Sequence, residues 1–408
     1  MARRRDRGSL TGTSKTTVGI VGAGPAGLVL AHVLRSHDVP FALLERHPHT
    51  ELLAVPKAGL IEYRTVKLLE AEGISPAILK FTTENHRCEF RTPETSVVID
   101  YGSVTGGRPH YIYPQHELVG ELADALVAQG ADVRFDTEVV GVRQSNDGVA
   151  LAVRSGDGSE AELTCDVAVG CDGPRGPVAS SLDAVRGIGE TLPVRWLAMI
   201  GAAPPLEPHT IYAAHPRGFA GQMRRGPTLT RYFLEVDAAD TLEAWPETRM
   251  REELAERLGF GARMNAVPLG EATLLDLRVR LLEPMQQGRM FLAGDAAHLF
   301  TPAGGKGMNL AIQDAVELGR GLADRFGAAD DGGRLSRYSQ TRLRAVWQTQ
   351  VFSNWMLRLI LAGFHGLSRS PADGEFSARV REGWIASLHS DPLFARWFAF
   401  AYAGVDPE

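Results

Sequence analysis

Thr17-Val18-Gly19-Ile20-Val21-Gly22-Ala23-Gly24-Pro25-Ala26-Gly27 is the stretch that decides the fold of this chain. Its first five residues are typical of an apolar strand, and the apolar run Leu28–Leu34 after the glycines is typical of a helix. A strand, Gly-x-Gly-x-x-Gly and a helix in this order are the fingerprint of a dinucleotide-binding unit. Gly22 permits the tight turn, Gly24 lets the backbone approach a pyrophosphate, and Gly27 lets helix and strand pack closely. The sequence therefore predicts an α/β fold.

An acidic residue follows this unit at the spacing that a dinucleotide site requires. The second predicted strand, Phe41–Leu44, ends at Glu45, close to the ~20 residues beyond the glycines at which a carboxylate meets the adenosine ribose. The alternative is a glycine-rich turn in an α/β domain that binds nothing, but this alternative does not explain the position of Glu45. A bound adenine dinucleotide is expected.

A second glycine-rich stretch lies late in the chain. Apolar residues lead into Gly294-Asp295, which predicts a buried strand that delivers the Asp295 carboxylate to the edge where open α/β sheets bind ligands. Gly304-Gly305-Lys306-Gly307 then leaves backbone N–H groups uncovered at the start of a helix predicted over Met308–Phe326. A carboxylate for ribityl hydroxyls and a positive helix end for an anionic reduced ring suit a flavin. The alternative is a turn with Asp295 as a helix cap only.

Composition limits the classes of function. The 408 residues are 44% hydrophobic and carry a net charge of -6, so the chain can bury large cores and lacks the basic stripe of a nucleic-acid-binding protein. Cys88, Cys165 and Cys171 have no metal-ligand spacing and are odd in number, which predicts free thiols, no metal and a cytoplasmic location. The longest apolar run is shorter than the ~20 residues of a membrane span. A soluble enzyme with a small substrate is expected.

Changes in composition along the chain predict four parts. They are a disordered arm (1–16), a Rossmann-like cofactor domain (17–75, 110–181 and 280–330), a β-sheet-rich substrate domain (76–109 and 182–279) and a C-terminal helical region (331–408). The helix predicted over Leu335–Leu361 has more apolar surface than one face can hide, so a homodimer is expected.

Local patterns place further elements within these parts. A helix is predicted over Pro56–Gly73, with Lys57 facing either the cofactor or water. Another helix is predicted to start at Gln115, whose amide is then placed to reach a phosphate or a flavin edge. A hairpin is predicted from Val133–Arg143 and Val149–Arg154.

The predicted substrate domain concentrates aromatic and arginine side chains. Its strands are predicted at Arg195–Gly201, Thr210–Ala214, Gly218–Arg224 and Thr228–Val236, with a helix near Arg249–Leu258. Gly221, Met223 and Arg225 alternate onto one strand face, so a register that turns Met223 into the pocket also turns Arg225 inward. The other register would turn Arg224 inward instead.

Gly22-x-Gly24-x-x-Gly27, Cys171-Asp172-Gly173 and Gly294-Asp295-Ala-Ala-His298, at these separations, closely resemble the class A flavoprotein aromatic hydroxylases. His215-Pro216-Arg217-Gly218-Phe219 and Glu283-Pro284-Met285-Gln286-x-Gly288-Arg289 resemble the para-hydroxybenzoate hydroxylase subgroup. The resemblance runs from about Val18 to Gly404. It implies the fold of that subgroup, non-covalent FAD, and NADH or NADPH and O₂ as co-substrates.

The resemblance also implies a role for particular residues around the cofactor. The adenosine ribose would lie on Glu45, the pyrophosphate on Gly22–Gly27 and the ribityl chain on Asp295. Lys57 stands where the family usually has arginine, and an ammonium is a poorer phosphate fork. In the turn after Glu45, Glu51 would oppose a 2′-phosphate if it lies close, although Arg46 could offset it, so NADH is expected to be used at least as well as NADPH. Further FAD contacts are implied for Lys57, Gln115, Asp172, Gly307, Met308 and Asn309, and donor contacts for Arg46, Arg175 and Arg278.

The substrate pocket departs more from the family. Tyr212 and Tyr402 match the tyrosines that relay the phenol proton, Pro302 matches the proline that lines the reaction site, and Arg225 matches the carboxylate-binding arginine. Met223 and Phe233 replace two hydroxyl-bearing residues that assist this arginine, a loss of roughly 1.5–3 kcal/mol for each hydrogen bond to the charge. Gly221 replaces a leucine and is expected to free space. Trp196 is expected to complete the pocket.

The implied reaction is hydroxylation of a phenolic or amino-substituted benzoate-type acid through a flavin hydroperoxide. The substrate is expected to be 4-hydroxybenzoate, which would be hydroxylated at position 3, or a close analogue. A hydroxylase of a larger modified aromatic acid is the alternative within the class. A non-enzymatic flavin- or NAD-sensing protein is the alternative outside it.

Overall fold

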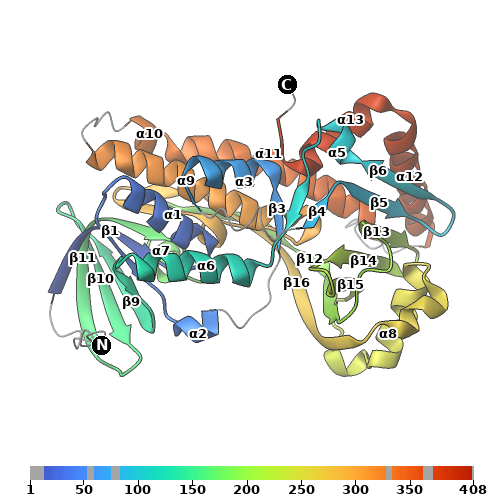
Figure 1. Ribbon diagram of the computed structural model, residues 1–408, viewed down its shortest axis with the longest axis horizontal. Helices are drawn as coiled ribbons and strands as arrows, with labels where there is room; N and C mark the ends of the chain where they lie inside the picture. Colours follow the sequence, from blue (N-terminus) through green and yellow to red (C-terminus); the bar gives the residue numbers. More distant parts are fainter. Residues whose placement is uncertain (1–12, 53–58, 75–82, 328–332, 362–370, 407–408) are drawn as a thin grey trace.

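The computed structural model describes residues 13–52, 59–74, 83–327, 333–361 and 371–406. These residues form two lobes, each built on its own large sheet, and the long strands β12 (Arg186–Gly201) and β16 (Leu269–Glu283) run out of the cofactor lobe into the other (Figure 1). Lys57, which was predicted to lie near the cofactor, falls outside the described residues.

The first lobe is organised by an eight-stranded sheet. Because β1 pairs in parallel with β2 and β11, the glycine-rich turn after β1 lies at the carboxyl edge of the sheet. The strand order is β17-β18-β11-β1-β2-β8, with β10 pairing with β11 and β9 with β10. The strands are β1 (Thr13–Val21), β2 (Phe41–Leu44), β8 (Val133–Arg134), β9 (Thr137–Gln144), β10 (Val149–Ser155), β11 (Glu160–Gly170), β17 (Gln286–Gln287) and β18 (Met290–Leu292).

Helices and a small sheet complete this lobe. Helix α1 packs on both α6 and α9, and its residues Leu28, Leu30 and Leu34 are fully buried. The three-stranded sheet has the order β3-β7-β4. The elements are α1 (Pro25–Ser36), α2 (His49–Leu52), β3 (Leu60–Glu62), α3 (Tyr63–Ala71), β4 (Thr83–Asn85), β7 (His110–Ile112), α6 (Gln115–Ala128), α7 (Pro177–Ser180), α9 (Lys306–Phe326) and α10 (Gly333–Ser336).

The second lobe is organised by another eight-stranded sheet, in the order β19-β16-β12-β15-β14-β13-β5-β6. Helix α11 (Tyr338–Ile360) packs against α9 of the first lobe and β13 of the second. The remaining elements are β5 (Arg87–Arg91), β6 (Ser96–Asp100), α5 (Tyr101–Val104), β13 (Thr210–His215), β14 (Gly218–Arg224), β15 (Thr230–Asp237), α8 (Glu247–Arg257), β19 (His298–Leu299), α12 (Pro371–Ser390) and α13 (Pro392–Ala403).

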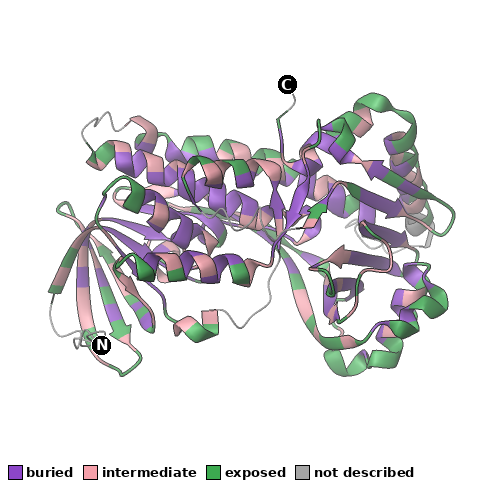
Figure 2. Ribbon diagram, viewed as in Figure 1, coloured by how far each residue is buried: buried purple, intermediate pink, exposed green. Residues whose placement is uncertain are grey.

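The two faces of the second sheet bury different side chains. One face presents Tyr212, Phe219 and Phe233 to the C-terminal helices, whereas the opposite face packs Ile211 and Tyr232 against α8. Figure 2 shows buried positions along the strands between these helices and exposed positions along the outer surface of α8. Alternation along β13, β14 and β15 therefore separates a candidate site face from a structural face.

The α/β class and the cofactor-binding lobe agree with the prediction, but several boundaries do not. The predicted arm to residue 16 is wrong at its end, because Thr13–Thr16 already pair with β11. The helix predicted from Pro56 begins at Tyr63, since Leu60–Glu62 form β3. The single strand predicted over Val133–Arg143 is two strands, one pairing with β2 and the other with β10.

The largest difference from the predicted elements concerns the two long strands that link the lobes. β12 begins at Arg186, before the predicted Arg195, and β16 was not predicted as a strand. Charged residues such as Asp276, Arg278 and Arg280 are exposed along β16. The strand was missed because its residues are buried at alternate positions only near its C-terminal end, so most of it lacks the apolar pattern of a strand. Among the described helices, none has the length and apolarity needed to cross a membrane.

Candidate active site

Three motifs that lie far apart in the sequence meet at the edge of the first sheet. A Cβ at Gly22 would lie 2.4 Å from the Cys171 carbonyl oxygen, so the first turn contacts the Cys171-Asp172-Gly173 turn. A Cβ at Gly294 would lie 3.2 Å from that of Ala26, so the Gly294-Asp295 turn contacts the start of α1. The convergence predicted for these motifs is present.

The glycine-rich turn has the shape that a pyrophosphate requires. Gly22 has φ of 102°, which favours glycine, and a Cβ at Gly27 would lie 1.9 Å from the Gly22 carbonyl oxygen. A Cβ at Gly24 would meet nothing within 4 Å, so the backbone there borders open space at the start of α1. The turn therefore fits an anion at the helix N-terminus.

Glu45 is fixed at this turn. Its carboxylate accepts hydrogen bonds from Ala23 N at 2.7 Å and from His47 N at 3.0 Å, and the residue is 6% exposed. These bonds place the Glu45 carboxylate beside the uncovered backbone of Gly24, where the ribose of an adenine dinucleotide would lie. The residues present fit FAD on these observations.

Asp295 lies beyond β18, in an exposed position between buried neighbours. Behind it, the buried Asp314 carboxylate accepts from Gly294 N at 3.0 Å and from His298 Nε2 at 2.5 Å. Arg342 Nε donates to the other Asp314 oxygen at 2.6 Å. Burial opposes the charge of Asp314, but His298 and Arg342 lower its pKa. This network holds the turn from inside while Asp295 is exposed, and His298 serves as a buried hydrogen-bond partner of Asp314.

The start of α9 differs from the prediction. The helix begins at Lys306 rather than Met308, so Gly307 and the half-buried Met308 lie in its first turn. The buried Asn309 amide is used by the protein: its oxygen accepts from Glu62 N at 2.9 Å, and its nitrogen donates to Leu60 O and Gly305 O. Any cofactor contact of Asn309 would therefore come from its backbone.

Lys306 is a site residue that local sequence patterns did not reveal. Its ammonium is buried, pairs with the Glu62 carboxylate at 2.7 Å, and donates to the carbonyls of Ala401 and Tyr402 at 2.9 and 2.8 Å. Burial lowers its pKa, and Glu62 opposes this effect. Because Glu62 and Tyr402 come from distant parts of the chain, no local pattern predicts these contacts.

Asp172 faces α7 as well as the cofactor edge. One oxygen accepts from Val178 N at 3.1 Å, and the other is buried without a hydrogen-bond partner among the described residues. Burial raises the pKa of Asp172 to about 6, although the Val178 bond and Arg46 favour the charged form. The charge of Asp172 therefore changes close to neutral pH.

The three arginines predicted for the nicotinamide donor are exposed. Arg46 Nε donates to His47 at 3.0 Å, and Arg278 donates to Asp276 at 2.7 Å. Arg175 lies in the turn after Asp172, and Arg280, which was not predicted, donates to Pro174 O beside it at 2.9 Å. Arg280 is therefore a β16 arginine that contacts this turn, and the donor role of Arg278 remains a prediction.

The two predicted relay tyrosines lie in contact. Tyr212 on β13 and Tyr402 in the last turn of α13 are buried, with 3.0 Å between their phenol oxygens. Burial raises the pKa of both phenols, so both are protonated at neutral pH. Phe90 stacks on Tyr212 with ring centres 5.5 Å apart, which fixes the ring from the other side. The pair is a path for one proton.

The pocket wall beside Tyr212 corrects one expectation. Gly221 pairs with Tyr212 on one side and Phe233 on the other, as a pocket residue should. Yet a Cβ at Gly221 would lie 2.8 Å from the Phe219 ring, so the space expected from this glycine is filled. Trp196 is fully buried beneath Phe219 and Phe233, with ring centres 4.7 and 5.1 Å away, and acts as packing behind the wall.

Positive charge gathers at the end of β14. Arg225 is 8% exposed, whereas Arg224 is half-buried, which agrees with the register that turns Arg225 inward. Burial and the nearby Arg231 lower the pKa of Arg225 to about 10. Arg231 pairs with Met223 across the sheet and lies over Phe233 at 5.3 Å. The buried Arg225 and the half-buried Arg231, beside apolar Met223 and Phe233, favour an anionic aromatic ligand.

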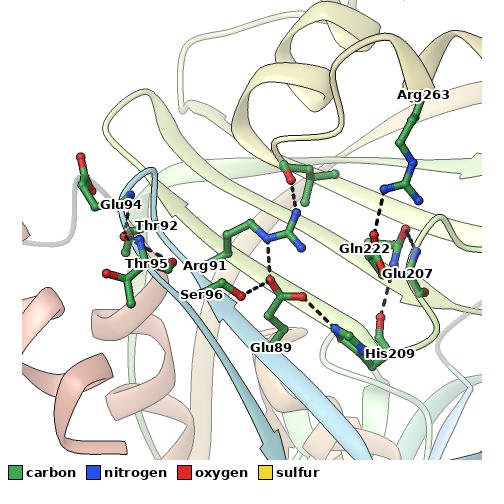
Figure 3. Close-up of polar contacts among 11 residues, drawn as sticks. Glu89, Arg91, Thr92, Glu94, Thr95, Ser96, Glu207, His209, Gln222 and Arg263 are labelled. Atoms are coloured by element: carbon green, nitrogen blue, oxygen red, sulfur yellow. Dashed lines mark hydrogen bonds and ion pairs between the residues drawn. The ribbon is translucent and has the colours of Figure 1, made fainter. Parts of the chain in front are cut away.

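The structural face of this sheet holds a buried polar network (Figure 3). Glu89 on β5 accepts hydrogen bonds from Arg91 at 2.6 Å, Ser96 at 2.7 Å and His209 at 2.7 Å. Burial alone would raise the pKa of Glu89, but these bonds outweigh it and hold the pKa at about 2. The network ties β5 to β13, whose next residues, Phe90 and Tyr212, face the site.

Two other predicted residues occupy the expected elements. Gln115 is the first residue of α6 and is half-buried. Pro302 is half-buried at the start of the turn that leads into α9, and its carbonyl accepts from Gly305 N. Both remain predictions as contact residues, because their roles depend on the bound cofactor and substrate.

Residues 15–353 match the protein family described as FAD binding domain. Over 400 residues the chain is 29% identical to p-hydroxybenzoate hydroxylase of Acinetobacter baylyi, an alignment that covers 97% of each protein. Among solved structures, the p-nitrophenol 4-monooxygenase PnpA of Pseudomonas putida has a TM-score of 0.80 at 19% identity and covers 98% of this chain and 100% of that one, which shows the shared fold.

A second solved structure is longer than this chain, so the match covers a smaller share of it. OxyS anhydrotetracycline hydroxylase of Streptomyces rimosus has a TM-score of 0.75 at 26% identity. The match covers 97% of this chain but only 77% of that protein. The match to p-hydroxybenzoate hydroxylase thus extends over 97% of that protein, whereas the match to OxyS extends over 77% of OxyS.

Proposed function

Because the chain belongs to the FAD-binding-domain family of flavoprotein aromatic hydroxylases, we propose that it hydroxylates a phenolic benzoate-type acid, 4-hydroxybenzoate or a close analogue. The observation that carries this proposal is the buried Tyr212–Tyr402 pair on the same sheet face as Arg225. When bound, FAD would take up the reducing equivalents of NADH or NADPH and activate O₂, chemistry that side chains lack. The protein has to hold the ring, exclude water and move one proton.

The tyrosine pair suits the removal of a phenol proton. Tyr212 is protonated, so it can accept the proton of a substrate hydroxyl only as its own proton passes to Tyr402. Tyr402 is protonated as well, so it has to release its own phenol proton to an acceptor outside the pair in the same transfer. Ionisation of the substrate raises the electron density of the neighbouring ring carbon, which favours attack by an electrophilic oxygen. The aromatic surroundings of both phenols keep this transfer away from bulk water.

The charge at the end of β14 suits the opposite end of such a substrate. Arg225 would bind a carboxylate as a fork, and Arg231 adds positive potential nearby. Met223 and Phe233 carry no hydroxyl, so charge rather than a hydroxyl network would orient the acid. This arrangement also fits an amino-substituted benzoate, since the anchor reads the carboxylate and not the para substituent.

A larger modified aromatic acid is the second candidate. It is supported by the 26% identity with OxyS anhydrotetracycline hydroxylase and by the apolar Met223 and Phe233. Two observations favour the smaller acid: the Phe219 ring fills the space over Gly221, and the chain matches p-hydroxybenzoate hydroxylase over 97% of its length.

For the donor we propose NADH at least as readily as NADPH. Arg46 donates to His47, and His47 in turn pairs with Glu51 at 3.3 Å. This chain of contacts engages the arginine and adds a carboxylate to the turn, both of which disfavour a 2′-phosphate. Steady-state kinetics with the two donors test this, and a strong preference for NADPH would contradict it.

We also keep the homodimer as a proposal. α11 exposes Val351 and Trp347, and α13 exposes Leu393 and Trp397, with 67%, 36%, 79% and 41% of each residue accessible. Large apolar side chains at this exposure favour a protein contact. Light scattering during size-exclusion chromatography measures the mass directly, and a monomer at micromolar concentration would contradict the proposal.

The proposed activity is tested with the FAD-loaded protein and a panel of acids. The panel contains 4-hydroxybenzoate, 4-aminobenzoate, 3-(3-hydroxyphenyl)propionate and anhydrotetracycline, with NADH or NADPH oxidation and product mass as readouts. We expect a hydroxylated product from one of the two benzoates. Product from anhydrotetracycline alone would favour the larger-acid candidate, and no product from any acid would contradict both.

A further inference from the structure

We propose that His110 is a positioning residue for the proton relay, because its ring holds the backbone of Tyr402 while the Tyr402 phenol meets Tyr212. This inference rests on the proposed function. Its structural basis is that His110 Nε2 lies 2.9 Å from the Tyr402 carbonyl oxygen, and that His110 is fully buried on β7.

The contact gives a hydrogen-bond donor to a backbone carbonyl group at the C-terminal end of α13. The last carbonyl groups of an α-helix have no partner within the helix. In α13, Phe400 O accepts from the N–H groups of Gly404 and Val405, whereas Ala401 O and Tyr402 O point to Lys306. Tyr402 O therefore receives two donors, the Lys306 ammonium and the His110 ring. Two donors from separate elements fix this carbonyl better than one.

The protonation of His110 follows from its partner. A carbonyl only accepts, so Nε2 carries the hydrogen. Burial and the nearby Lys306 charge lower the pKa of His110 to about 3, although the Tyr402 bond favours the charged form. The ring is neutral in the working range, and its donor function does not change with pH there.

His110 is a costly choice for packing alone. Its ring contacts those of Tyr101 and Tyr402, with centres 5.1 and 4.9 Å away, and Nδ1 is buried without a hydrogen-bond partner among the described residues. An unmade buried hydrogen bond destabilises the folded protein, a penalty that leucine or phenylalanine would avoid. The donated bond to Tyr402 O is the feature that only a side chain with an N–H can supply.

The consequence for the relay is geometric. Tyr402 is within the last turn of α13, so the position of its carbonyl sets the position of its phenol. The phenol oxygens of Tyr212 and Tyr402 lie 3.0 Å apart, and proton transfer between them becomes slower when their distance or angle departs from hydrogen-bond geometry. Loss of the His110 donor should therefore weaken the stabilisation of a substrate phenolate.

The test uses two variants of the FAD-loaded protein. His110→Gln keeps a side-chain N–H that can reach the Tyr402 carbonyl, and His110→Leu removes it. The probe is 4-hydroxybenzoate, whose bound phenolate is followed by absorbance from pH 6 to 9. We expect His110→Leu to raise the apparent pKa of the bound phenol by about one unit, and His110→Gln to remain near wild type. Tyr402→Phe marks complete loss of the relay.

Hydrogen exchange supplies a readout that needs no substrate. The amides of Gly404 and Val405 belong to the cap of α13, and their exchange is measured by mass spectrometry in each variant. We expect faster exchange in His110→Leu and wild-type exchange in His110→Gln. A bound phenol that titrates as in wild type in His110→Leu, or a shift in His110→Gln as large as in His110→Leu, would overturn the proposal.

The two readouts separate this proposal from the proposed function. If wild type binds no 4-hydroxybenzoate, the proposed substrate fails and hydrogen exchange decides the positioning role. Unchanged exchange in His110→Leu would then overturn it, and faster exchange restored by His110→Gln would support it.

Discussion

The phenol oxygens of Tyr212 and Tyr402 lie 3.0 Å apart, although 190 positions separate the two residues in the chain. Tyr212 comes from β13 of the second sheet, and Tyr402 comes from the last turn of the C-terminal helix. The relay therefore forms only when α13 packs on the sheet. The stability of the C-terminal helices and the chemistry of the site are coupled through this contact.

Tyr212→Phe should reduce product formation roughly 100-fold, the size of a typical general acid–base contribution, because the substrate phenol loses the group that takes its proton. Product is measured by mass spectrometry beside the rate of NADH oxidation. Tyr232→Phe is the matched control, since Tyr232 is fully buried on the opposite face of the same sheet. Equal loss of product in both variants would contradict the relay.

Asp295→Ala should weaken FAD binding while the protein stays folded. Asp295 is exposed in a turn whose backbone is held by Asp314, so we expect the Asp295 carboxylate to serve the cofactor more than the core. FAD affinity is measured by quenching of flavin fluorescence on titration, and folding by circular dichroism. Asp147→Ala, in an exposed hairpin turn, is the control. Unchanged FAD affinity would show that Asp295 serves only the turn.

Arg225→Ala should weaken binding of the aromatic acid by roughly 2–5 kcal/mol, the cost of removing one partner of a buried charge pair. Arg225→Lys should retain only part of the wild-type binding affinity for the acid, because an ammonium group lacks the planar, two-pronged geometry of a guanidinium. Arg224→Ala is the control, as Arg224 is the more exposed neighbour. Binding is measured by isothermal titration with FAD bound. Normal binding in Arg225→Ala and lost binding in Arg224→Ala would reverse the assignment of the pocket face.

Glu89→Gln should destabilise the protein at neutral pH and have little effect in acid. The pKa of Glu89 falls from its ordinary value of 4.5 to about 2 in the fold, so its contribution is complete above pH 4.5 and is lost as the pH falls toward 2. We expect a difference on the order of 1–3 kcal/mol at pH 7. Urea unfolding at several pH values measures it.

The exposed Glu94, which lies in the turn between β5 and β6, provides the control for this experiment. Glu94→Gln should change the free energy of unfolding little at any pH, because exposed carboxylates interact weakly. A Glu89→Gln effect that is the same at pH 7 and pH 3 would contradict the assigned pKa.

The sequence predicted the parts of the site that depend on local geometry. The positions of Gly22, Gly24, Gly27 and Glu45 follow from the requirements of one turn and one strand, and each has the expected environment. The inward register of Arg225 also follows from strand alternation. The pairing of Tyr212 with Tyr402 came from the resemblance to a family, since nothing local links them.

Contacts between distant side chains could not be predicted from the pattern. Lys306 looked like part of a glycine-rich loop, but the fold buries it against Glu62 and the end of α13. Gly221 suggested open space, but the Phe219 ring, two residues away on the same strand face, fills that space. The direction of this ring depends on the side-chain rotamer of Phe219, which the sequence does not specify. His110 showed no motif, and its role depends on a carbonyl 292 residues away.

Incorporation of ¹⁸O tests the central claim most directly. The FAD-loaded protein is given NADH, 4-hydroxybenzoate and ¹⁸O₂, and the product is analysed by mass spectrometry. A flavoprotein aromatic hydroxylase inserts one oxygen atom from O₂ into the ring, so we predict a dihydroxybenzoate that carries one ¹⁸O. Consumption of NADH with only labelled hydrogen peroxide, or a product whose new oxygen comes from water, would contradict the account.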